Sequence, residues 1–299
     1  MTAPLDANAV VEEQLDQLLG NIAHAFGGDA LSWYGPITYG ADTAVRRVIE
    51  ERRKTDRSDD LAILLTTPGG VVEIVQRIVA VVRHYFQVVN FIIPDYAYSA
   101  GTVLVMSGDA IHMDYYSRLG PIDPQILRGD RLVPALGYCE RYNELIKESG
   151  RRALTDAELA VLIGAFDQAE LYQYEQAREL SISLLKDWLV RYKFKDWSKT
   201  ETRQRDVTSA MKKQRARAIA RALSNTARWH SHAAGISAEV LRDQLKLRID
   251  DLDEQRKQVV ERKQAVENYQ SLLEDYMIRR QHFGVIHMRG QYVPYHVHE

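Results

Sequence analysis

Two hydrophobic patterns alternate through the first half of the chain. Residues 61–65 and 88–93 are short apolar runs bounded by polar or turn residues, which predicts two buried strands. Between them, apolar residues recur at helical spacing from Val72 to Val82, which predicts a crossover helix. A strand, a helix and a second strand in this order are typical of a parallel sheet covered by helices.

The same patterns extend to both sides of this unit. Before it, we expect a helix over residues 8–25, a strand over 31–37 and a helix over 44–54; after it, a further helix and a strand over 110–115. Past residue 124 the pattern becomes mainly helical, with a loop or short hairpin over 126–134, a helix over 136–149 and a capping box at Thr155. The prediction is an N-terminal helical segment (1–30), an α/β core (31–150) and a helical extension (151–299).

The last part of the chain contains no glycine or proline between residues 237 and 282, which predicts one long helix. One strict seven-residue stripe on it is apolar, but the complementary stripe is not, so only half of a coiled-coil seam is present. We therefore expect this helix to pack on the core or on a neighbouring subunit. The stripe consists of Leu245, Leu252, Val259, Val266 and Leu273. Residues 284–299 are expected to form a short extended tail.

Candidate chemistry is concentrated at Ser99, which lies among small residues where a turn is expected to lead into a helix. A serine in this position lies near unpaired backbone N–H groups, which stabilise negative charge on a substrate oxygen. The glycine turn at Gly69 and Gly70 ends the neighbouring strand, and glycine lets another backbone N–H approach. The alternative is an ordinary βαβ unit in which these glycines only end strands.

Three motifs in this region resemble those of the Clp-fold serine peptidases, and most of all the group called serine dehydrogenase proteinases (SDH-type). The resemblance covers roughly residues 35 to 125. It implies a Clp/crotonase-like ββα spiral core with a mainly helical C-terminal region, an oligomeric assembly, and a peptide or protein substrate. It also implies that Ser99 is the nucleophile and that the N–H groups of Gly70 and Ala100 form the oxyanion hole. The motifs are Thr67-Pro68-Gly69-Gly70, Tyr98-Ser99-Ala100-Gly101-Thr102 and Ser117-Arg118-Leu119-Gly120-Pro121-Ile122-Asp123-Pro124.

The general base is the part of the site that departs from the family pattern. The segment from Pro121 to Pro124, where the usual arrangement has a histidine, contains none. The order Ser, Asp, His attributed to the SDH-type group makes Asp123 the acid, with His230 or His232 as the base. His112 and Lys147 are the alternatives, and His112 is more readily interpreted as a structural strand residue.

The same residues are compatible with two other functions. A crotonase-like enzyme acting on acyl-CoA would use the two N–H groups without a serine nucleophile, and an oligomeric scaffold of the same fold would be catalytically silent. The chain contains no Gly-x-Gly-x-x-Gly pattern, so the word "dehydrogenase" in the group name does not describe its expected activity.

The amino-acid composition narrows the possible classes of protein and binding partner. Of the 299 residues, 45% are hydrophobic and 27% charged, which is ordinary for a globular protein, and the formal net charge is −2. The single cysteine, Cys139, excludes an internal disulfide, and the chain shows neither a signal-peptide pattern nor a long apolar span, so we expect a cytoplasmic protein. No cofactor or metal is expected, because His296 and His298 alone are weak evidence for a metal site. Residues 186–228 are basic and contain aromatic side chains; we interpret them as a solvated face or a subunit contact rather than a nucleic-acid site.

Overall fold

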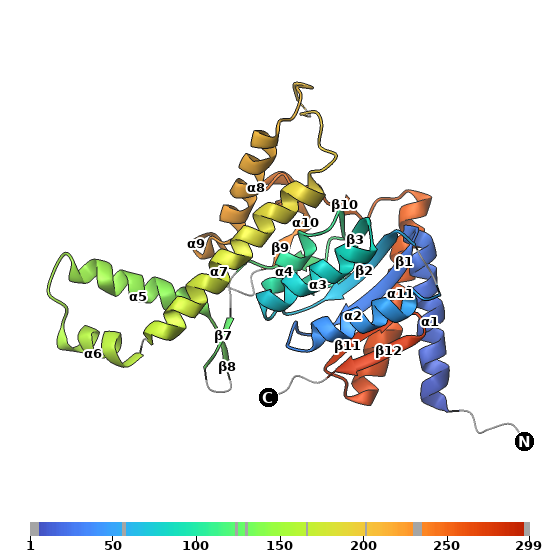
Figure 1. Cartoon of the computed structure of the whole chain (residues 1–299), viewed down its shortest axis with the longest axis horizontal. Coiled ribbons are helices and arrows are strands. Elements are labelled where there is room, and N and C mark those ends of the chain that lie inside the picture. Colours follow the sequence, from blue (N-terminus) through green and yellow to red (C-terminus); the bar gives the residue numbers. More distant parts are fainter. Residues whose placement is uncertain are drawn as a thin grey trace, which may run out of the picture.

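The computed structural model describes residues 6–55, 58–122, 125–128, 131–165, 167–200, 202–229 and 235–295. A twisted sheet lies at the centre, with helices on both faces, and a second group of helices projects away from it (Figure 1). The predicted α/β fold with a mainly helical C-terminal region is confirmed.

The main sheet contains seven strands in the order β10-β5-β3-β2-β1-β11-β12. The strands β1, β2, β3, β5 and β10 are parallel, whereas β11 and β12 join the edge next to β1 in antiparallel orientation. The predicted apolar run at 61–65 is the core of β2 and is buried throughout, because helices cover both faces of the sheet. The bounds are β1 (Asp29–Tyr34), β2 (Asp60–Thr66), β3 (Val88–Ile93), β5 (Ala110–Met113), β10 (Asp250–Asp251), β11 (Gly284–Met288) and β12 (Gln291–Tyr295).

The helices form a layer on each face of the sheet (Figure 1). Helices α2 (Ala41–Arg52), α3 (Val72–Tyr85) and α4 (Ala100–Val105) share one hydrophobic cluster with one face of the sheet. Helices α1 (Ala7–Phe26) and α11 (Lys257–Arg280) share a second cluster with the other face. The predicted crossover helix is α3, and its apolar stripe is buried as the spacing requires.

The prediction of one long helix over 237–282 is wrong. The structure has a short helix α10 (Ala238–Asp243), then an irregular segment and β10, and only then α11. Lys246 adopts a left-handed φ of 52°, and the residues after it bury Leu247 and Ile249 in the core. Burial of these two side chains takes priority over helical propensity here, which the sequence pattern does not reveal.

Residues 284–295 are also not an extended tail. They form the hairpin β11–β12, which turns at Gly290 with φ 79° and pairs with β1. The C-terminal part of the chain therefore completes the main sheet, although the proposed division at residue 150 stays a prediction. His296 and His298 lie outside the described residues.

The projecting part consists of a hairpin and several helices (Figure 1). The hairpin predicted at 126–134 is present as β7 and β8, and the capping box at Thr155 is confirmed, because its hydroxyl accepts from Glu158 N while the Glu158 carboxylate accepts from Thr155 N. Trp188 and Phe194 of the basic segment are buried in the core. The elements are β7 (Gln125–Arg128), β8 (Arg131–Pro134), α5 (Ala135–Ser149), α6 (Asp156–Ala165), α7 (Gln168–Trp188), the π-helix η1 (Leu189–Lys193), α8 (Ser209–Leu223) and α9 (Thr226–Trp229).

Candidate active site

Ser99 lies in a strained turn between the short strand β4 (Tyr96–Ala97) and helix α4. Its backbone has φ 52° and ψ −118°, a conformation that a residue with a Cβ rarely adopts and that costs on the order of 1–3 kcal/mol. Only 5% of Ser99 is exposed. Such strain is concentrated at functional sites, and a strained turn that ends on a helix is also how nucleophilic serines of other folds are presented.

The glycine turn lies directly against this serine. A Cβ added to Gly69 would be 2.8 Å from Ser99 Cβ and 3.3 Å from Ala100 N, so the absence of a side chain at residue 69 allows the two turns to touch. Isolated parallel bridges hold the turn from both sides, with Ile37 paired to Gly70 and Thr67 paired to Ala97. The sequence motif at 67–70 and the motif at 98–102 thus meet at one point.

The two N–H groups proposed for an oxyanion hole flank this point. Ile37 N donates to Gly69 O at 2.8 Å and Val71 N donates to Ile37 O at 2.9 Å, so Gly70 stands between the two bonded residues. In a parallel ladder the N–H of such a residue points to the opposite side, here away from Ile37. Within the described part of the chain, neither Gly70 N nor Ala100 N donates to a helix or sheet acceptor.

Gly70 also has a structural role that limits its use in mutagenesis. Its φ is 147°, and an added Cβ would lie 2.1 Å from Ile37 O. A Gly70→Ala substitution would therefore disrupt the bridge to Ile37 as well as the amide. An effect of Gly70→Ala on activity could therefore not be distinguished from an effect on folding.

A small three-stranded sheet brings together the chain segments that precede or follow the other predicted catalytic residues. Strand β6 (Arg118–Leu119) pairs with β4 on one side and with β9 (Ile236–Ser237) on the other. Ser99 follows β4, Asp123 follows β6, and His230 and His232 precede β9 in the sequence. Asp123, His230 and His232 themselves lie outside the described residues.

The segment that leads to Asp123 is fastened to the serine turn by Thr102. The Thr102 hydroxyl lies 2.8 Å from Ala97 O and 2.9 Å from Gly120 O, and it accepts from Gly120 N at 3.0 Å. Further along, Ile122 N donates to Leu223 O at 3.0 Å. The structure thus places residues up to Ile122 between α4 and the end of α8.

The described residues on either side of His230 and His232 contact the elements near the serine turn. Before these histidines, Trp229 Nε1 donates to Ala222 O at 2.8 Å. After them, a Cβ on Gly235 would be only 2.7 Å from the Arg118 side chain, so Gly235 lies directly on β6. Both contacts lie beside the elements that hold the serine turn and the Asp123 segment.

Comparison with known proteins shows the family of the chain. The family model described as ClpP-like SDH-type serine proteinase matches residues 33–209, more than half of the chain. The chain belongs to this family. The resemblance found in the three sequence motifs is thereby confirmed at the level of the family.

Individual relatives are distant. Two uncharacterized proteins of Methanocaldococcus jannaschii are 30% identical over 79 residues (26% of this chain, 28% of that protein) and 28% identical over 134 residues (44% and 43%). These matches span less than half the length of either relative. Among solved structures, two variants of the 1510-N membrane-bound stomatin-specific protease, one in complex with a substrate peptide, match with a TM-score of 0.31 and 23% identity. The matches cover 48% of this chain and 74% and 77% of those chains.

His112 does not lie on the serine's side of the sheet. It sits on β5 with its ring against Phe26 of α1, with the ring centroids 5.0 Å apart, whereas α4 covers the other face. Burial lowers the pKa of His112 to about 4, because the charged imidazolium is poorly solvated there. The interpretation of His112 as a structural strand residue is the one that fits this environment.

Lys147 lies on α5, in the group of helices that projects from the sheet (Figure 1). Its side chain is exposed, and α5 contacts α6 and α7. Within a single chain, the described elements therefore keep Lys147 apart from the serine turn.

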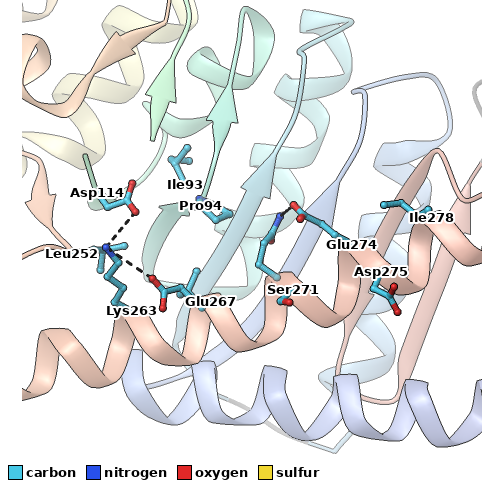
Figure 2. A pocket seen from close by; sticks show the side chains of 12 residues that line it. Ile93, Pro94, Asp114, Leu252, Lys263, Glu267, Ser271, Glu274, Asp275 and Ile278 are labelled. Carbon is cyan, nitrogen blue, oxygen red and sulfur yellow. Dashed lines mark hydrogen bonds and ion pairs between the residues drawn. The ribbon is translucent and has the colours of Figure 1, made fainter. Parts of the chain in front are cut away.

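A groove of about 480 Å³ lies between α11 and the end of β3, on the face opposite α4 (Figure 2). Carboxylates of Asp114, Glu267, Glu274 and Asp275 line it, and the Lys263 ammonium pairs with Asp253 at 2.5 Å and lies 3.6 Å from Asp114. Ser99, Gly70 and Ala100 are not among the residues that line this groove. In the described part of the chain, no cluster of histidine, cysteine or acidic residues is arranged to hold a metal, and no helix has the length and apolar character needed to cross a membrane.

Proposed function

We propose that this protein hydrolyses peptide bonds through an acyl-enzyme formed on Ser99. The strained Ser99 turn packed against the glycine turn is the observation that carries the proposal. The Ser99 hydroxyl attacks the scissile carbonyl, and the N–H groups of Gly70 and Ala100 stabilise the oxyanion that develops. Membership of the ClpP-like SDH-type serine proteinase family supports the same reaction.

The proposed base is His230 or His232, with Asp123 as the group that orients it. A serine needs an acceptor for its proton, which the imidazole of a histidine can provide. A carboxylate that is hydrogen-bonded to the imidazole holds it in the orientation needed for this transfer. Support comes from the small sheet, because β4, β6 and β9 hold the neighbouring segments side by side. The substrate is a peptide or protein, and the reaction requires no cofactor.

We also propose that the protein acts as a homo-oligomer. The projecting helices α5 and α6 expose apolar side chains that a soluble single chain would bury. Leu159 and Val161 are each 46% exposed, and Ile163 is 73% exposed. A second copy that covers α6 would remove this surface from water.

Labelling with a fluorophosphonate tests the nucleophile directly. The reagent should modify Ser99, as mapped by mass spectrometry, and Ser99→Ala should abolish labelling and lower kcat for casein hydrolysis on the order of 10⁴-fold or more. Alanine can keep the same backbone turn, and Ser271→Ala, in the groove on α11, serves as the control that remains labelled. Peptidase activity that survives in Ser99→Ala would refute the mechanism, and specific binding of CoA thioesters without labelling would favour the acyl-CoA enzyme.

The two histidines are tested separately once Ser99 labelling is established. His230→Ala or His232→Ala should lower kcat on the order of 10³-fold, and the other variant should remain active. Full activity in both variants would assign the base to another residue, either of the same chain or of a neighbouring subunit.

A further inference from the structure

Tyr295, the last residue of β12, occupies a slot beside the chain that leads to the glycine turn. A Cβ on Gly284 would be 2.5 Å from Tyr295 Cζ, and a Cβ on Gly35 would be 2.9 Å from the Tyr295 hydroxyl. The tyrosine side chain therefore fills space that is available only because both neighbours are glycines.

The Tyr295 hydroxyl joins two parts of the chain. Trp33 Nε1 donates to it at 2.7 Å, and the hydroxyl donates to Pro36 O at 2.8 Å. Burial raises the pKa of Tyr295, so its proton remains available for the bond to Pro36. Trp33 is 1% exposed, which makes it a firm anchor for this contact.

Pro36 is the residue before the strand segment that supports the glycine turn. Ile37 N donates to Gly69 O, and Ile37 O accepts from Val71 N. Gly69 in turn touches Ser99 and Ala100 N. A continuous series of contacts thus runs from Tyr295 through residues 36 and 37 to the two turns that carry the proposed oxyanion hole.

We propose that Tyr295 is a positioning residue that fixes the Gly70 amide relative to Ser99 through Pro36 and Ile37. This inference rests on the proposed function. An oxyanion hole depends on donors that are held in place before the charge develops, so small displacements reduce the rate without removing a catalytic group. The C-terminal hairpin thereby contributes to the active site through this series of contacts.

The test compares Tyr295→Phe with Tyr292→Phe. Both residues lie on β12 and both hydroxyls are hydrogen-bonded, but Tyr292 faces the opposite cluster, where its hydroxyl lies 3.1 Å from His282 Nδ1. Tyr295→Phe should slow fluorophosphonate labelling and lower kcat about tenfold, less than the loss of a whole donor, with KM unchanged. Tyr292→Phe should keep the wild-type rate.

Hydrogen exchange provides a readout that does not depend on activity. The amides of Ile37 and Val71 should exchange faster in Tyr295→Phe than in the wild type, and should be unchanged in Tyr292→Phe. The inference would be overturned if Tyr295→Phe were labelled at the wild-type rate and its amides exchanged at the wild-type rate. Equal losses of labelling rate and kcat in Tyr295→Phe and Tyr292→Phe would also overturn it. If the wild type itself is not labelled while exchange changes as expected, the positioning of the turn holds and the proposed function fails. An unfolding curve for each variant identifies any loss of the folded protein.

Discussion

Thr102 provides a sharp test of how the serine turn is joined to the segment that leads to Asp123. Its side chain is fully buried, and its hydroxyl can donate to Ala97 O or Gly120 O while it accepts from Gly120 N. Thr102→Val keeps the shape of the side chain but removes both the donor and the acceptor. Gly120 N retains a second acceptor, Ala97 O at 3.1 Å, whereas Gly120 O loses its hydroxyl donor.

The expected loss of stability follows from the missing donor to Gly120 O. Leaving one buried carbonyl without a donor typically destabilises a protein by about 1–3 kcal/mol, so the free energy of unfolding of Thr102→Val should fall by about that amount. Thr66→Val is the matched control. The Thr66 hydroxyl is also buried, yet it has no hydrogen-bond partner in the described part of the chain. The same substitution at residue 66 should therefore be neutral or stabilising, because it removes a polar group that is buried without compensation.

Urea unfolding followed by tryptophan fluorescence and circular dichroism gives both values. The two variants should shift the midpoint in opposite directions, or Thr66→Val should not shift it, while the slope stays constant. An equal loss at both positions would mean that the cost reflects the methyl group in the core rather than the hydrogen bonds of Thr102. The reasoning would then be refuted.

Two further predictions concern pH and assembly. Because the pKa of His112 is lowered to about 4 from 6.5, the unfolded chain binds the proton first as the pH falls, and stability should drop by up to about 3 kcal/mol between pH 6.5 and pH 4. His112→Leu should reduce this dependence, and an unchanged dependence in urea unfolding at pH 7 and pH 4.5 would contradict the assignment. Ile163→Asp on α6 should lower the mass seen by sedimentation at micromolar concentration, whereas Ile278→Asp, equally exposed on α11, should not; a wild-type mass of one chain would contradict the proposed oligomer.

The periodic pattern of the sequence correctly predicted the elements of the core. Strands such as β2 and β3 and helices such as α1 and α3 follow it because a buried face requires apolar residues at the period of the element. The same reasoning placed Ser99 at the start of a helix and predicted a turn at Gly69. These features depend on neighbours in the sequence, so local information was sufficient.

Other features were decided by contacts between distant residues. The stripe that predicted a long helix is continuous in the sequence, but Leu247 and Ile249 are buried by the core and end α10 instead. The pairing of β11 with β1, which turns a supposed tail into part of the sheet, depends on residues more than two hundred positions apart.

The features of the candidate site also fall into those that the sequence determined and those that the fold determined. The sequence by itself determined the serine, the two glycines and the absence of a histidine beside Asp123. The strained φ of Ser99, the contact of Gly69 with Ala100 N, and the hydroxyl bonds of Thr102 and Tyr295 arise only in the folded chain. Their physical reason is that a backbone can be held in an unfavourable conformation only when packing and hydrogen bonds from several distant segments act on it together.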